Sequence, residues 1–297
     1  MTVFERGWLS ANNVLFHGRG PTALVDSGYA THSAQTVALV RQVLGQRPLD
    51  LLLNTHLHSD HCGGNAALQR EYPGLKTWIP PGLAESVRHW DPVALTYEAT
   101  GQCCPQFRMD RLLVPGAGLM LGDAEWEVHG APGHDPHSVV LFEARERVLI
   151  SADALWANGF GVVFPELEGE QAFREVGATL DLIEQLGPRL VIPGHGPLFD
   201  DVGAALASAR RRLAGFVEDP PRHAAHAAKV LIKFKLLELQ RVERESLEHW
   251  AAGTTYVQLV HGRWFRDTEL HEWIGRLVAQ LAASGAARLD GTLVLDN

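Results

Sequence analysis

The feature that most constrains this chain is a run of metal-ligand side chains directly after a short apolar segment. Residues Leu51–Asn54 read as a buried strand. The string HLHSDH follows at positions 56–61 and supplies His56, His58, Asp60 and His61. Imidazole nitrogens and carboxylate oxygens are ligands that suit zinc, iron or manganese. The alternative interpretation is a surface loop that happens to be rich in histidine.

Three more side chains of ligand type occur at similar places farther along the chain. His134, Asp153 and His195 each come just after a short apolar run that reads as a strand. These runs are Glu125–His129, Arg147–Ile150 and Arg189–Ile192. Loops at strand ends are where a sheet presents functional groups, and the glycines beside the two histidines allow tight turns. If these strand ends share one edge, enough ligands converge there for two metal ions with open positions for water.

The first two-thirds of the chain alternates strand-like and helix-like segments. The other expected strands are Asn13–His17, Thr22–Val25, Lys76–Ile79 and Ser138–Glu143, and the expected helices are Ser33–Leu44, Gly64–Glu71, Leu83–Trp90 and Gln171–Leu186. The stretch 125–150 reads as a meander rather than as strand–helix–strand units. A mixed α/β sandwich therefore fits better than a single doubly wound sheet.

The last third of the chain reads as a different module. Helices are expected at Asp201–Phe216, Ala225–Gln240, Glu243–Ala252 and Thr268–Ser284. Two apolar runs around Asp290-Gly291 then indicate a hairpin. Helices followed by a hairpin are the order of a winged-helix module, so we expect a catalytic domain at 1–210 and a helical, winged-helix-like module at 211–297.

The HLHSDH string, the Pro-Gly-His at 132–134, the lone Asp153 and the Pro-Gly-His-Gly at 193–196 together resemble the metallo-β-lactamase-fold superfamily. The resemblance covers roughly residues 1–200 and implies a four-layer αββα sandwich with a dinuclear site at one edge. By position, it assigns the first metal to His56, His58 and His134, and the second to Asp60, His61 and His195. It makes Asp153 the bridge and gives Asp26 the task of supporting the histidines by hydrogen bonding.

This resemblance implies a hydrolase that uses a metal-bridging hydroxide. The cofactors would be two divalent ions, zinc first, with iron or manganese as alternatives, and Asp60 is a candidate for steering protons. The fold alone does not decide the activity. The β-lactamases themselves act outside the cytoplasm and generally lack the aspartate that Asp153 matches, whereas the glyoxalase II, lactonase and thioesterase-like branches have it. We therefore expect an ester, thioester or lactone substrate.

Three alternatives remain open. The persulfide dioxygenase branch has this motif but binds one iron through two histidines and one aspartate. An RNA or phosphodiester hydrolase is a second alternative, since Lys229, Lys233 and Lys235 fall on one expected helix; against it, that helix is rich in leucine and the module carries 12 basic and 11 acidic residues. A protein that uses metal only for its structure is the third, although structural zinc sites are closed and often contain cysteine.

Five residues are candidates for the substrate groove. They are Tyr97 and Arg108, on a segment without periodicity that could form a lid, together with His137, Trp156 and Phe160. Each has a structural alternative: His137, at a position where the related branches have a small residue, also reads as a loop histidine with a structural hydrogen bond. Cys103 and Cys104 are expected to be buried.

Composition sets the remaining limits. Hydrophobic residues make up 46% and charged residues 21%, which excludes a disordered chain. No apolar run reaches the length of a membrane-spanning helix. The formal net charge of −9 argues against a nucleic-acid-coating protein. Three cysteines and no visible export signal favour the cytoplasm. We thus expect an enzyme with a small-molecule substrate and no membrane partner, whose C-terminal module shapes access to the groove or supports a homodimer.

Overall fold

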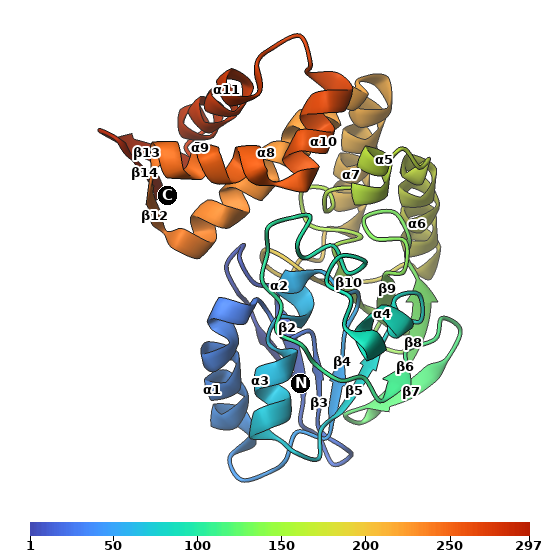
Figure 1. The fold of residues 1–297 in the computed structure, drawn as a ribbon. Coiled ribbons are helices and arrows are strands. Elements are labelled where there is room, and N and C mark those ends of the chain that lie inside the picture. The colour runs from blue at the N-terminus through green and yellow to red at the C-terminus, as the bar shows by residue number, and fades with distance from the viewer. The chain divides into compact units, whose positions relative to one another are not determined.

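The structure is a computed structural model that describes residues 1–297, and the chain divides into two compact units. The first unit contains Met1–Leu95 and Cys103–Ala214, and the second contains Thr96–Gln102 and Gly215–Asn297. Figure 1 shows the elements in chain order, from blue at the N-terminus to red at the C-terminus. Each unit is described by itself below.

The first sheet of the first unit has the strand order β1-β2-β3-β4-β5-β6. Its strands are β1 (Thr2–Phe4), β2 (Asn13–Phe16), β3 (Ala23–Val25), β4 (Leu51–Leu53), β5 (Lys76–Ile79) and β6 (Arg111–Leu112). Strands β3 to β6 pair in parallel, so their carboxyl ends share one edge. Helices α1 (Ser33–Leu44) and α3 (Asn65–Glu71) cover one face, where Val40 and Leu68 pack with Leu52.

The second sheet has the order β11-β10-β9-β8-β7. Its strands are β7 (Gly118–Leu121), β8 (Ala124–Gly130), β9 (Val139–Glu143), β10 (Val148–Ala152) and β11 (Leu190–Pro193). Strand β9 runs antiparallel to both β8 and β10, and β11 runs parallel to β10. Strands β8, β10 and β11 therefore all end at the same edge of the sheet.

A continuous apolar core lies between the two sheets. It joins Val25 and Leu53 of the first sheet to Val139, Ile150 and Ile192 of the second. Helix α6 (Ala172–Leu186) packs near the second sheet, where the Thr179 hydroxyl donates a hydrogen bond to the Pro132 carbonyl at 2.8 Å. The expected αββα sandwich is confirmed.

Backbone hydrogen bonds join the two sheets at the edge where the ligand strands end. The Val139 amide, at the start of β9, donates to the Thr55 carbonyl at 2.9 Å. The Asn12 amide donates to the Gly194 carbonyl at 2.7 Å. The loops of one sheet are thus held in register with the loops of the other.

Short helices complete the first unit. They are the 3-10 helix η1 (Ala30–His32), α2 (Ser59–Cys62), α4 (Ala84–His89) and α5 (Phe164–Glu168), followed by α7 (Val202–Glu218), whose last residues belong to the second unit. Helix α2 is a single turn formed by the HLHSDH string itself. The sequence did not predict α2 or α5, because one turn of helix shows no periodicity. It also missed the short strands β1, β6 and β7.

The second unit combines helices with a small sheet. Its elements are α8 (Pro220–Leu239), β12 (Arg241–Glu243), α9 (Arg244–Gly253), α10 (Thr255–Trp264), α11 (Leu270–Ala283), β13 (Ala287–Asp290) and β14 (Leu293–Asp296), with the strand order β12-β14-β13. The expected hairpin is present. Helix α10 was missed because its β-branched and aromatic residues have low helix propensity. The winged-helix assignment remains a prediction.

The segment Thr96–Gln102 joins this unit although it lies far from it in sequence. The Tyr256 amide donates to the Ala99 carbonyl at 3.1 Å. Gly101 has a φ of +65°, and a Cβ there would lie 2.8 Å from the Trp250 ring.

Helix α8 begins earlier than expected, at Pro220, because Asp219 caps it and proline suits the first turn. No helix in the structure is long and apolar enough to cross a bilayer.

The loop contact made by Asn12 generates a stability prediction. Its Nδ2 group donates to the carbonyls of Pro193 and Gly196, at 2.9 and 2.8 Å. Asn12→Ala leaves these carbonyls without donors, so we expect a loss of about 1–3 kcal/mol in the free energy of unfolding, measured by urea denaturation. Asn158→Ala, at an exposed position, is the control and should change little. Equal stability of the two variants would contradict this account.

Candidate metal centre

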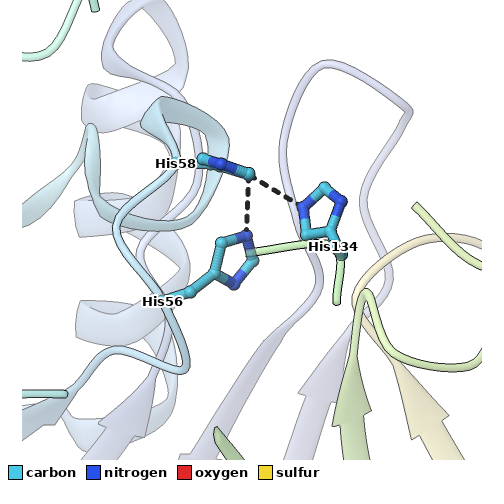
Figure 2. A group of neighbouring side chains, drawn as sticks. All are labelled: His56, His58 and His134. Atoms are coloured by element: carbon cyan, nitrogen blue, oxygen red, sulfur yellow. Dashed lines mark hydrogen bonds between the residues drawn. The ribbon is translucent and has the colours of Figure 1, made fainter. Parts of the chain in front are cut away.

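Three histidines from three loop positions point their ring nitrogens at one place. His56 and His58 follow β4, and His134 follows β8. The His58 Nδ1 atom lies 3.1 Å from His56 Nε2 and 2.8 Å from His134 Nε2. Figure 2 shows the three rings converging from the two sheets. This cluster, called the first group below, consists of nitrogen atoms that a single cation can bind together.

A second group lies beside the first. It contains Asp60, His61, Asp153 and His195, whose ligand atoms all lie within 4.8 Å of one another. Asp60 and His61 come from α2, Asp153 follows β10, and His195 follows β11. Asp60 Oδ2 lies 3.0 Å from His195 Nε2, and Asp153 Oδ1 lies 3.4 Å from His61 Nε2. All seven side chains that the sequence singled out as metal ligands thus gather at one edge of the sandwich.

The Asp153 carboxylate lies between the two groups. Its Oδ1 atom faces the second group, while its Oδ2 atom lies 3.4 Å from His134 Nε2 of the first. The close approach of the β11 loop leaves no room for a side chain at Gly194, where a Cβ would lie 2.2 Å from Asp153 Oδ1. The glycine before His195 is therefore required by the position of this carboxylate.

Asp26 occupies the supporting position that the sequence suggested. It is buried at the end of β3, with a φ of +57° that non-glycine residues rarely adopt. Its Oδ1 accepts from the Thr55 amide at 2.9 Å, and its Oδ2 accepts from the Thr55 hydroxyl at 2.8 Å and from His61 Nδ1 at 2.7 Å. The last bond keeps the proton on His61 Nδ1 and aims Nε2 at the second group.

Two histidines have their tautomers set in this way. His134 Nδ1 donates to the Val162 carbonyl, which leaves Nε2 for the first group. His61 Nε2 is buried and has no hydrogen-bond partner. A buried nitrogen that faces two carboxylates and the His195 imidazole, and makes no hydrogen bond to them, has the surroundings of a metal ligand. The residues present therefore fit divalent cations.

The two groups differ in how they hold protons. Burial, with a smaller effect of His134, lowers the pKa of His58 to about 4. Burial also lowers the pKa of His56 well below its usual value. Burial opposes protonation of His61 too, but Asp153, Asp26 and Asp60 outweigh it and raise that pKa well above the ordinary value. At neutral pH His56 and His58 are thus neutral, whereas His61 holds a proton.

Aromatic side chains surround the two groups. The Trp156 Nε1 atom donates to Asp153 Oδ1 at 3.3 Å, and its ring meets the His195 ring edge to face. The centroids of the Phe164 and His58 rings lie 5.2 Å apart. Trp8 stacks on the His195 ring at 5.5 Å. Sequence reasoning missed Trp8 because nothing near it in the chain links it to His195.

The other groove candidates differ in their placement. His137 is exposed and lines a small hollow together with His56 and Asp135. Phe160 is 1% exposed, with the Arg212 guanidinium over its ring, and is a core residue. Tyr97 is buried within the second unit. Arg108 is exposed, and its backbone is held by hydrogen bonds with the Gln69 side chain.

The cysteines are not arranged as expected. Cys103 is exposed, so the prediction that it is buried was wrong, and Cys104 is partly exposed. The Cys103 amide donates to the Tyr29 hydroxyl at 3.0 Å, which places its backbone at the surface of the core. The sulfur of Cys104 lies 3.7 Å from that of the buried Cys62, with no disulfide.

Comparisons with known proteins agree with this geometry. Residues 6–195 match the family model of the metallo-beta-lactamase superfamily. A hydroxyacylglutathione hydrolase of Anaeromyxobacter dehalogenans is 30% identical over 76% of this chain and 78% of its own length. The acyl-coenzyme A thioesterase MBLAC2 of Gallus gallus is 26% identical over 66% of this chain and 77% of its own. A beta-lactamase domain protein from Burkholderia ambifaria, at 20% identity and a TM-score of 0.60, shares the fold over 99% of this chain and 91% of its own.

The contrast between the groups predicts how metal binding depends on protons. Filling the second group at pH 7 must displace the proton on His61, so about one proton should be released with that ion and its affinity should rise with pH. The ion of the first group should displace no proton from His56 or His58 between pH 7 and 5, and its binding should weaken near pH 4, where His58 becomes protonated. Titration calorimetry in buffers with different ionisation enthalpies measures both.

Asp26→Asn is the informative variant for this measurement. It removes one of the negative charges that raise the pKa of His61, so less proton should be released by the second ion. The first ion should bind as in the unaltered protein. Release of a proton with the first ion instead of the second would contradict the assignment.

Proposed function

Because the chain belongs to the metallo-β-lactamase superfamily, we propose that it is a dinuclear metal-dependent hydrolase of an ester, thioester or lactone. The observation that carries the proposal is the Asp153 carboxylate, whose two oxygens face two separate ligand groups. The two relatives that are named as hydrolases of acyl-coenzyme A and of hydroxyacylglutathione support a thioester in particular.

The metal ions would supply activation of water and polarisation of a carbonyl oxygen. The chain's own residues set the geometry for this chemistry. Asp153 would join the two groups through its two oxygens, and the hydrogen bond from His61 Nδ1 to Asp26 sets the direction of that ring. Asp60 is the more exposed of the two ligand carboxylates, at 14% against 7% for Asp153. Its Oδ2 atom is therefore the better placed to receive a proton and pass it to solvent.

We propose zinc as the ion in both groups. Nitrogen and oxygen ligands without sulfur suit zinc, and they suit iron and manganese as well. The persulfide dioxygenase alternative needs a single iron, bound through two histidines and one aspartate. Two complete ligand groups favour the dinuclear enzyme over that alternative.

The second unit supports a small-molecule substrate rather than RNA. Two of the three lysines of helix α8 are engaged within the unit: Lys233 Nζ contacts Asp296, and Lys235 Nζ contacts Glu238 at 2.7 Å. These cations are thus already neutralised locally and offer little to a phosphate backbone. We propose that residues 211–297 form a winged-helix-like module that shapes access to the site or supports a homodimer, and that the enzyme acts in the cytoplasm.

Removing single ligands tests the metal assignment. Asp153→Ala and His56→Ala should each lower the metal content below two ions per chain, and turnover should fall by more than about 100-fold, beyond what loss of a supporting residue causes. Asp267→Ala, at an exposed acidic position, is the control and should keep both. Metal content is measured by elemental analysis of the purified protein. Hydrolysis that persists in a metal-free double variant would refute the mechanism.

A panel of substrates on one preparation tests the reaction class. We expect turnover of thioesters, followed by simple esters and lactones, and little or none of β-lactams, phosphodiesters and RNA. Oxygen uptake with a persulfide, together with one iron per chain, would replace the hydrolase by the dioxygenase. Turnover of phosphodiesters alone would favour a nuclease.

A further inference from the structure

Trp8 is a large apolar residue that is exposed to solvent beside the second group. Its side chain is 54% exposed. One face of the indole stacks on the His195 ring, with centroids 5.5 Å apart and planes inclined by 9°. The rings of Trp8 and Trp156 meet edge to face, with centroids 5.3 Å apart, and Trp156 in turn donates to Asp153 Oδ1. Trp8 thus touches one metal-ligand side chain directly and is one residue removed from the bridging carboxylate.

The loop that carries Trp8 is held in place by two of the segments that carry candidate ligands, helix α2 and the loop after β11. The Ser10 amide donates to the Gly7 carbonyl at 3.0 Å and closes a turn around Trp8. The next amide, that of Ala11, donates to the Asp60 carbonyl at 3.0 Å, and the Asn12 amide donates to the Gly194 carbonyl. The position of the indole is therefore tied to the backbone of Asp60 and of the β11 loop.

A merely structural role would be to shield His195 from water. The His195 Nδ1 atom is buried and has no hydrogen-bond partner, so some shielding takes place. Shielding requires only the stacked face of the indole, however. More than half of Trp8 remains exposed beside the second group, where an apolar surface gains free energy by covering an apolar group of a ligand.

We propose that the exposed side of Trp8 binds the hydrocarbon part of the acyl group, so that the enzyme prefers substrates with long or aromatic acyl chains. The inference rests on the proposed function, because it assumes an acyl substrate. Coenzyme A and glutathione, the thiols of the thioesters suggested by the relatives, are polar and charged. The apolar part of such a substrate is therefore its acyl chain, and Trp8 is a specificity-determining residue for it.

A series of acyl thioesters of one thiol, from acetyl to decanoyl, tests this. Each methylene that Trp8 covers is worth about fourfold in affinity, so kcat/KM should rise with chain length in the unaltered enzyme. In Trp8→Ala we expect about a tenfold or greater loss for decanoyl and little change for acetyl, mainly through KM. Trp8→Phe should restore most of the preference. Met120→Ala, which removes an equally exposed apolar residue of β7, should leave the series unchanged.

A binding measurement separates this inference from the proposed function. Thioether analogues, in which a methylene replaces the carbonyl, are titrated by calorimetry into the metal-loaded protein with short and long alkyl chains. Dissociation constants that do not depend on chain length, or that Trp8→Ala weakens equally for all chains together with a loss of metal, would overturn the role of Trp8. Absence of turnover for every ester, thioester and lactone would overturn the proposed function instead.

Discussion

The crowding of seven ionisable side chains, five of them buried, within a few ångströms is the constraint on which the rest of this structure depends. Ring nitrogens and carboxylate oxygens that face one another away from water repel unless protons or cations lie between them. His61 carries such a proton between Asp26 and Asp153. His56 and His58 of the first group are neutral, because burial disfavours their protonation. Cations bound between the carboxylates and the imidazoles would relieve this repulsion, as the proton on His61 does.

The two sheets bring these side chains together because the strands that precede them end at neighbouring edges. Strands β4, β8, β10 and β11 end at neighbouring edges, and backbone hydrogen bonds such as Val139 to Thr55 tie the edges together. Supporting bonds then set the ring orientations, through Asp26 for His61 and the Val162 carbonyl for His134. These hydrogen bonds fix the direction in which the two rings present their Nε2 atoms.

The gathering of the candidate ligands and most of the sandwich could be predicted from the sequence, because both leave local signals. Strand-length apolar runs preceded each ligand, and the predicted bounds of the strand Lys76–Ile79 and the helix Ser33–Leu44 match the structure. The surroundings of the site were harder. Trp8 meets His195 only in three dimensions, and its neighbours in sequence are unremarkable in type. Phe160 and Trp156 looked alike as aromatics after Asp153, yet only Trp156 reaches its carboxylate.

The short segment Thr96–Gln102 has a consequence for how the protein is made. It leaves the ribosome with the first unit but finds its partners, Tyr256 and Trp250, only near the end of synthesis. Until then the segment lacks its packing partners, while the chain on both sides of it can already form the sandwich. The second unit cannot be completed by a continuous stretch of polypeptide. Folding of the second unit therefore requires the segment Thr96–Gln102, which lies in sequence between two parts of the first unit. This requirement couples the folding of the two units.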